Sequence, residues 1–210
     1  MVSACLLFKE RLLVPRPSRI DEQRKQLLPI VCQVFSELGY RGTTTAELAA
    51  RCQVRENILY RLWRDKKAMF LAAIDDIFER RAQRWKEILS EDQSAEQAAE
   101  AMIAYEARHQ GEFGFYRVVF AALVEAGDSD IHEAITRMYQ RFQKSLRTLV
   151  KTNREGATRP AGLSADTTAW AIIGLATVSN IARELDLLSR QQREDMFARA
   201  AKHLIHGRSS

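Results

Sequence analysis

The residues with the most informative chemistry lie between positions 54 and 64. Four apolar residues there recur at helical spacing and predict one buried stripe: Val54, Leu59, Leu62 and Trp63. The other side chains are expected to face outward: Arg55, Glu56, Asn57, Ile58, Tyr60, Arg61 and Arg64. Arg and Asn suit the major-groove edges of guanine and adenine, and Tyr and Arg suit phosphates. The segment therefore predicts a short helix, over about residues 55–62, that contacts a duplex.

Other side chains of catalytic or metal-binding type lack the partners that such chemistry needs. His203 and His206 share a helix face, but the sequence suggests no third metal ligand beside them. Glu96, Glu100 and Glu106 lie on a face expected to be exposed, without a partner nucleophile or base. We identify no glycine-rich phosphate loop and no Ser/His/Asp order. The sequence thus predicts no catalytic residue, no cofactor, no metal site and no enzyme activity.

Basic residues are concentrated in the first part of the chain. The 210 residues carry a formal net charge of +5. Residues 1–90 contain 17 Lys and Arg against 11 Asp and Glu, whereas residues 91–210 contain 15 against 16. This asymmetry suits a polyanion-binding module joined to a nearly neutral one, although chance surface charge gives the same counts. Three unpaired cysteines (Cys5, Cys32 and Cys52) favour a reducing, cytoplasmic setting, and no stretch is long and apolar enough to span a membrane.

Helical periodicity runs through nearly the whole chain without strand alternation, so the expected fold class is all-α. The expected helices cover residues 21–38, 45–52, 55–62, 66–89, 94–109, 112–125, 129–151, 166–188 and 191–206. Pro29 predicts a kink or a later start of the first helix, and Gly39 is expected to end it. Thr44 with Glu47, and Ser189 with Gln192, have the spacing of capping boxes.

The expected elements divide the chain into three parts. Residues 1–18 are either a flexible basic arm or a segment upstream of the true start. Residues 19–66 hold two short helices joined by a tight connection and preceded by a supporting helix, which is the layout of a helix-turn-helix DNA-binding domain. Residues 67–210 form a second, all-helical domain.

The helix-turn-helix region resembles a known family. The resemblance rests on Gly39-Tyr40-Arg41-Gly42-Thr43-Thr44-Thr45-Ala46-Glu47-Leu48-Ala49, Val54, Leu59-Tyr60-Arg61, Trp63, Asp65-Lys66 and Ala68-Met69-Phe70. In this order and without gaps, these residues are similar to the signature of TetR-like (tetracycline-repressor-like) regulators, over about residues 24–72. Beyond that region the chain shares only the family's helical character and length.

The resemblance implies roles for individual residues. Thr44, Tyr60 and Lys66 are expected to contact phosphates, and Arg55 and Asn57 are our candidates for base edges, with Arg61 on the same face. The family usually has Gly where this chain has Asn57, and Thr or Ser where it has Ile58. Asn57 is therefore expected to read a base, and Ile58 to touch a thymine methyl group.

The resemblance also implies a pocket for a small-molecule effector among the later helices. Candidate lining residues are Tyr105, Phe113, Tyr116, Phe120, Tyr139, Phe142, Trp170 and Asn180, with Glu106 and His109 as further polar groups. The alternative for each aromatic side chain is a place in the hydrophobic core.

One recognition helix reads only a few base pairs, so a two-fold dimer on a palindrome is expected, with the helices about 34 Å apart or more. The last two helices are the expected interface, through Ala171, Gly174, Leu175, Val178, Ala182 and Leu185, and through Met196, Phe197, Ala200 and Leu204. The predicted function is a homodimeric, ligand-inducible repressor of a double-stranded DNA operator. The alternatives are a helical protein-interaction module without DNA binding and an activator of the same fold.

Overall fold

The computed structural model describes residues 18–89, 93–111, 114–155 and 162–206. In these ranges the chain forms helices and no strand, which confirms the all-α prediction. The helices are α1 (Arg19–Gly42), α2 (Thr45–Arg51), α3 (Glu56–Leu62), α4 (Lys66–Leu89), α5 (Ala95–Arg108), α6 (Phe115–Val124), α7 (Ser129–Arg154), α8 (Ala165–Glu184) and α9 (Arg190–His206). Within the described part, no helix is long and apolar enough to cross a membrane.

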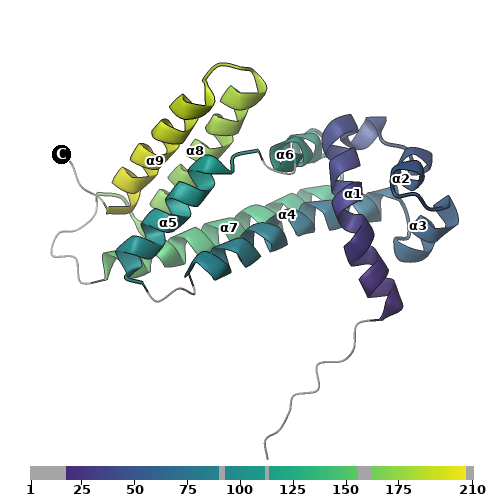
Figure 1. The fold of residues 1–210 in the computed structure, drawn as a ribbon, viewed down its shortest axis with the longest axis horizontal. Coiled ribbons are helices and arrows are strands. Elements are labelled where there is room, and N and C mark those ends of the chain that lie inside the picture. The colour runs from purple at the N-terminus through teal and green to yellow at the C-terminus, as the bar shows by residue number, and fades with distance from the viewer. Residues whose placement is uncertain (1–17, 90–92, 112–113, 156–161, 207–210) are drawn as a thin grey trace, which may run out of the picture.

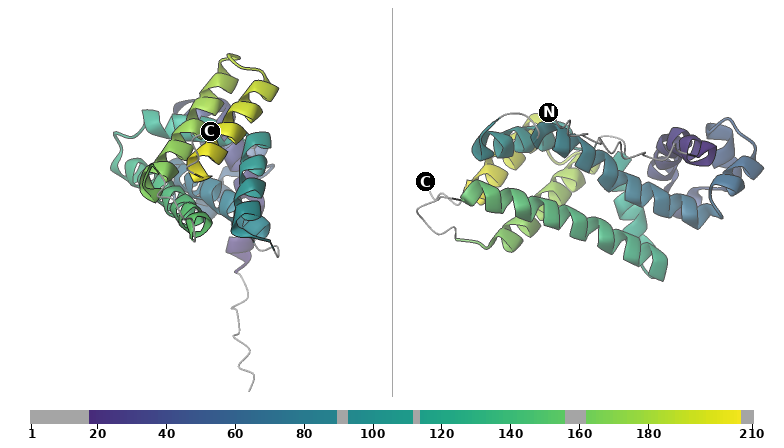
Figure 2. Two further views of the ribbon diagram at one scale, coloured as in Figure 1. Left: turned by 90° about the vertical axis from the view of Figure 1, so that its left-hand side faces the viewer. Right: turned by 90° about the horizontal axis from the view of Figure 1, so that it is seen from below.

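The helices form an elongated molecule with two distinct ends (Figure 1). α1, α2 and α3 pack together at one end, and α5, α8 and α9 pack together at the other. α4 and α7 run between the ends and lie side by side (Figure 2), while α6 packs against α1. Any change in the α5–α8–α9 end can therefore reach the α1–α3 end through α4 or α6.

The first helix differs from its prediction at Pro29. α1 begins at Arg19, where the Ser18 hydroxyl accepts the backbone N–H of Asp21 at 3.1 Å, and it continues through Pro29. Pro29 is exposed, so water can solvate the carbonyl that the ring deprives of its hydrogen bond. The backbone departs from helical geometry only at Gly39, which has φ 68° and ψ 178°. The predicted interruption at Pro29 is therefore wrong, whereas a break at Gly39 is confirmed.

The two predicted capping boxes have different outcomes. Ser189 and Gln192 form both bonds of the box, at 2.9 and 3.3 Å. The Thr44 hydroxyl accepts the backbone N–H of Glu47 at 3.1 Å, which forms the first half of the other box. The Glu47 carboxylate instead lies 3.8 Å from Arg51, one helical turn along the same helix.

A buried cluster holds α1, α2, α3 and the start of α4 together. Its largest fully buried side chains are Val31, Phe35, Leu48, Leu59, Leu62, Met69 and Phe70. The Phe35 and Phe70 rings pack with 4.8 Å between centroids. Burial of a Leu or Phe side chain stabilises a fold by roughly 1.5–3 kcal/mol, so Leu59 and Leu62 are sufficient to anchor the short helix α3.

α8 exposes an apolar face that differs from the predicted interface. Ala182 and Phe197 were expected in the interface, but both are buried inside the chain. The exposed face includes three predicted members, Gly174, Val178 and, at the C-cap, Leu185. Trp170 and Ile181 are exposed on the same helix but were not predicted. α8 is apolar around most of its circumference, so periodicity alone placed the outward stripe on partly wrong residues.

Candidate DNA-binding surface and internal cavity

α3 presents a polar face because its apolar residues anchor it from the other side. Leu59 and Leu62 are fully buried, whereas Arg55, Asn57 and Arg61 are exposed and Tyr60 is 47% exposed. Ile58 is an exception, since it is half-buried and packs against the core. Its predicted role as a thymine contact loses support for this reason.

Arg55 and Asn57 lie at the start of α3, with Arg55 as the N-cap. Neither side chain has a hydrogen-bond partner among the residues that the structure describes. Arg61 differs, because its Nη2 donates to Gln23 Oε1 on α1 at 2.9 Å. The two side chains predicted to read bases are therefore the ones whose donors remain available on this face.

A hydrogen-bonded chain of side chains links α2 to α3. Tyr60 Oη donates to Thr45 Oγ1 at 3.2 Å, and Thr45 Oγ1 donates to Glu56 Oε2 at 2.8 Å. Thr44 is exposed beside them as the cap of α2. The sequence analysis did not identify Thr45, although it follows Thr44 directly. These two hydrogen bonds hold the Tyr60 hydroxyl at the rim of the polar face.

The backbone of α3 is also held at its end. Arg24 Nε donates to the Leu62 carbonyl at 2.6 Å, which ties the last turn of α3 to α1. A cation near helix C-terminal carbonyls is favourable because these carbonyls have no partner inside the helix. α3 is therefore rigidly placed on α1, as a helix that reads a groove must be.

Lys66 has a different environment from the one predicted. Its Nζ donates to the carbonyls of Tyr40 and Thr43, each at 2.9 Å, and lies 4.5 Å from the centroid of the Tyr40 ring. These contacts turn the ammonium group inward, toward the turn that follows Gly39. They favour a role in positioning that turn over the predicted phosphate contact.

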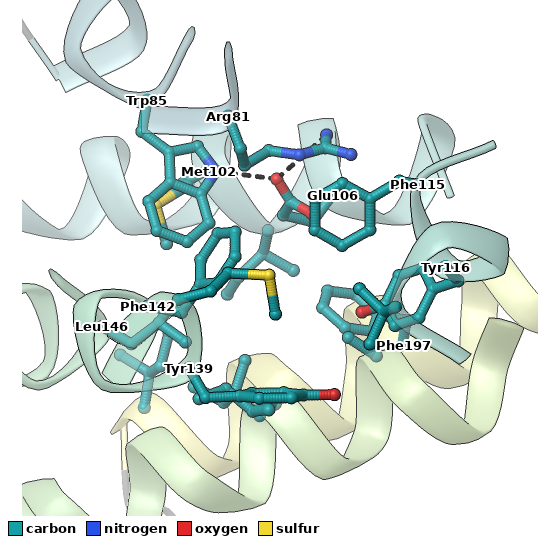
Figure 3. Close-up of a pocket in the computed structure, with 17 residues that line it drawn as sticks. Arg81, Trp85, Met102, Glu106, Phe115, Tyr116, Tyr139, Phe142, Leu146 and Phe197 are labelled. Atoms are coloured by element: carbon teal, nitrogen blue, oxygen red, sulfur yellow. Dashed lines mark hydrogen bonds and ion pairs between the residues drawn. The ribbon is translucent and has the colours of Figure 1, made fainter. Parts of the chain in front are cut away.

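A cavity of about 60 Å³ lies between α4, α5, α6, α7, α8 and α9. Most of its lining is apolar or aromatic: Trp85, Met102, Phe115, Val119, Met138, Phe142, Leu146, Ile172 and Phe197 among others (Figure 3). Burial raises the pKa of Tyr116 and of Tyr139, which line it too. Both phenols therefore stay protonated at neutral pH.

One wall of the cavity carries opposite charges. Arg81 Nη1 lies 3.3 Å from Glu106 Oε1, and the same oxygen accepts the indole N–H of Trp85 at 2.7 Å (Figure 3). The Arg81 side chain is only 9% exposed. Burying a guanidinium in this way is costly without a paired anion, so Glu106 accounts for its presence there.

Comparisons with known proteins agree with this architecture. Residues 32–73 match the family model described as bacterial regulatory proteins, tetR family. Over these residues the chain is similar to that family. The matched region covers α2, α3 and most of the cluster that anchors them, so the resemblance lies in the predicted helix-turn-helix unit.

Solved structures show the same fold throughout the chain. A putative TetR-family transcriptional regulator from Rhodococcus sp. superposes with TM-score 0.75 and 16% identity, covering 88% of this chain and 98% of that one. A putative transcriptional regulator from Saccharomonospora viridis in complex with choline gives 0.73 at 16% identity, covering 87% and 96%. FadR from Bacillus subtilis in complex with stearoyl-CoA gives 0.69 at 14% identity, covering 88% and 99%. Sequence comparison with curated proteins finds no significant match.

The cavity includes only some of the predicted pocket residues. Tyr116, Tyr139 and Phe142 line it, as does Glu106. Phe113 lies outside the described residues. The other predicted members do not line it: Tyr105, Phe120, Trp170 and Asn180.

These four residues are placed elsewhere by the packing of their helices. The Tyr105 ring stacks on His109 at 4.2 Å, and Tyr105 lines a neighbouring cleft. The Phe120 ring lies 6.0 Å from the Tyr116 ring, centroid to centroid, and Trp170 is 49% exposed. Asn180 is buried and donates to the Ala176 carbonyl at 2.8 Å.

The sequence reasoning missed Arg81, Trp85 and Met138 as lining residues. A signal for Arg81 was present, since it lies three residues after Phe78 and four before Trp85, on the inner face of α4. A lone arginine on an apolar stripe is rarely buried without a partner. The position of Arg81 therefore predicts an acidic side chain facing it from another helix.

Tertiary packing also supplies ligands that the histidine spacing did not suggest. Glu96 and Glu100 on α5 lie near His206 on α9, with one potential ligand atom of each within 4.8 Å of the others. Glu96 is exposed and Glu100 forms an ion pair with Lys202. Among the described residues this group places two acids beside His206 where the sequence suggested no further ligand, but it has the form of an ordinary surface ion-pair cluster.

Proposed function

We propose that this regulator is a repressor that binds a palindromic operator as a homodimer in the cytoplasm and releases it when a small molecule binds the cavity. The observation that carries the proposal is the face of α3, where Arg55 and Asn57 have unpaired donors on a rigidly held helix. Two such faces related by a two-fold axis would read two half-sites in successive major grooves.

The dimer is supported by the exposed apolar face of α8. Trp170, Val178 and Leu185 are 49%, 55% and 63% exposed, although side chains of this kind are usually buried. Gly174 lies between them and adds no side chain, so a second helix could approach closely. A partner copy would bury this face in an isologous contact.

Release by an effector is supported by the position of the cavity along α4. The helix carries Lys66 at its start and Arg81 at the cavity wall. The fifteen-residue separation corresponds to about 22 Å along a helix. Two similar regulators were solved with choline and with stearoyl-CoA, which supports a ligand-responsive role for this chain as well. An effector can act only through its different affinities for the two states.

Selection of bound duplexes from a random pool tests DNA recognition, the palindrome and its spacing together. On the selected operator, Asn57→Ala should weaken binding roughly 5- to 150-fold and relax the preference at one base pair. Arg137→Ala on α7 is the matched control, since it removes an exposed arginine far from α3. Failure to enrich any duplex would contradict the proposed function.

Two further measurements separate the finer claims. Light scattering of the native protein should give a dimer, and Val178→Glu should give a monomer that stays folded. Transcription from the operator in a reporter should fall when the regulator is present. A rise would identify an activator of the same fold.

A further inference from the structure

Arg81 has a polar atom that the folded protein leaves unsatisfied. Its side chain is 9% exposed, and Nη1 has no hydrogen-bond partner although Glu106 Oε1 lies 3.3 Å away. That oxygen already accepts the Trp85 indole N–H at 2.7 Å. A buried N–H donor without an acceptor costs free energy that an incoming acceptor would recover.

Arg81 lies at the junction between the cavity and a neighbouring cleft. Arg81 and Phe115 both line the cavity, and both line the neighbouring cleft of about 610 Å³ between α1, α4 and α6. The cavity behind them is apolar. The cleft in front of them is lined by four arginines (Arg80, Arg81, Arg117 and Arg183) and by two acids (Glu37 and Asp76).

The surroundings of Arg81 favour a negatively charged ligand over a positively charged one. The Arg81 guanidinium lies 5.4 Å from the Tyr105 ring centroid and 5.7 Å from that of Phe115. The protein's own cation therefore already occupies the aromatic faces that would attract a cationic ligand. An oxyanion, in contrast, would gain a guanidinium donor on a side of the pocket that is rich in arginine.

We propose that the effector is an amphipathic organic acid. Its carboxylate binds Arg81 at the junction between cleft and cavity, and its apolar body fills the space between Phe115, Met138 and Phe142. This inference rests on the proposed ligand-responsive function and specifies its chemistry. Because the cavity is small, the body enters by displacing side chains, and the carboxylate competes with Glu106 for Arg81. Arg81 belongs to α4, so this exchange acts on the helix that carries Lys66.

The test compares three probes with the same eight-carbon chain and different heads: octanoate, octanamide and octylamine. Titration calorimetry on the full-length protein gives the affinity for each, and Trp85 fluorescence gives an independent signal from the cavity wall. Octanoate should bind at least about ten-fold more tightly than either of the others, because charge-assisted hydrogen bonds are the stronger ones. Octylamine binding as tightly as octanoate, or no binding of octanoate, overturns the proposal.

Variants assign the preference to Arg81. Arg81→Gln should abolish the difference between octanoate and octanamide, and Arg81→Lys should keep part of it if the glutamine variant fails to fold. Glu106→Gln removes the competing carboxylate and should tighten octanoate binding. Arg84→Gln is the matched control, because Arg84 is on the same helix but half-exposed and paired with Glu87. An unchanged octanoate preference in folded Arg81→Gln overturns the proposal.

Operator binding measured on the same samples separates this inference from the proposed function. Octanoate should release the operator from the native protein and not from Arg81→Gln. If the native protein binds its operator but prefers octylamine, the acid proposal fails while the regulator assignment stands. If no duplex is bound in the absence of any probe, the proposed function itself fails.

Discussion

Replacement of Lys66 by Met distinguishes an internal role from a phosphate contact. Met keeps most of the length and apolar stem of the side chain and is a similarly good helix former. It removes the ammonium group that donates to the carbonyls of Tyr40 and Thr43 and lies over the Tyr40 ring. The substitution therefore isolates the polar interactions of Lys66.

The expected loss of stability follows from these contacts. Hydrogen bonds to a charged donor in a partly exposed place contribute about 1 kcal/mol each, and the ring contact adds about 0.5–1 kcal/mol. The free energy of unfolding should thus fall by about 2–3 kcal/mol. In a chain of this size that corresponds to a fall in Tm of roughly 5–10 °C. Arg64→Met is the control, since Arg64 is 83% exposed and should change stability by less than about 0.5 kcal/mol.

Two assays decide between the roles. Urea unfolding followed by circular dichroism gives the change in stability. The salt dependence of operator binding gives the number of phosphate contacts, because each contact contributes about 0.9 to the slope of log K against log salt. We expect Lys66→Met to leave this slope unchanged. A slope that falls by about 0.9 for each protomer, with unchanged stability, would refute the internal role.

Three other expectations follow from the described contacts. Gly114→Ala should destabilise the protein by more than about 2 kcal/mol, because Gly114 has φ +66° and an added Cβ would lie 2.3 Å from a side-chain oxygen of α1. Gly42→Ala, where the nearest atom would be 3.7 Å away, should be close to neutral in the same unfolding assay. Burial raises the pKa of the Cys32 and Cys52 thiols, so iodoacetamide should label both only after denaturation, as read by peptide mass. Hydrogen bonding to a lysine on α4 and to backbone N–H groups lowers the pKa of Asp128 in the folded protein, so its contribution is present above the unfolded-state value of about 4 and is lost as the pH falls further. Asp128→Asn should therefore flatten the acid limb of a plot of Tm against pH, and an unchanged limb would contradict this.

The sequence by itself determined the DNA-binding unit, because the signals for it are local. The Thr44 cap, the tight turn after α2 and the apolar spacing of Val54, Leu59 and Leu62 act within a few residues of each other. They placed α2 and α3 to within about one residue at each end and assigned the outward direction of Arg55 and Asn57. Pro29 misled the local reasoning about α1, since an exposed proline with helical φ costs one hydrogen bond and need not bend the chain.

Tertiary structure decided which partner each inward or outward side chain meets. Amphipathic spacing defines a face of a helix, but it does not say which helix packs against that face or at what angle. For this reason Phe197 lines the cavity while Trp170 is exposed, and Lys66 binds carbonyls far back in the chain. The pairing of Arg81 with Glu106 joins α4 to α5, and it depends on a helix crossing that neither segment's own sequence specifies.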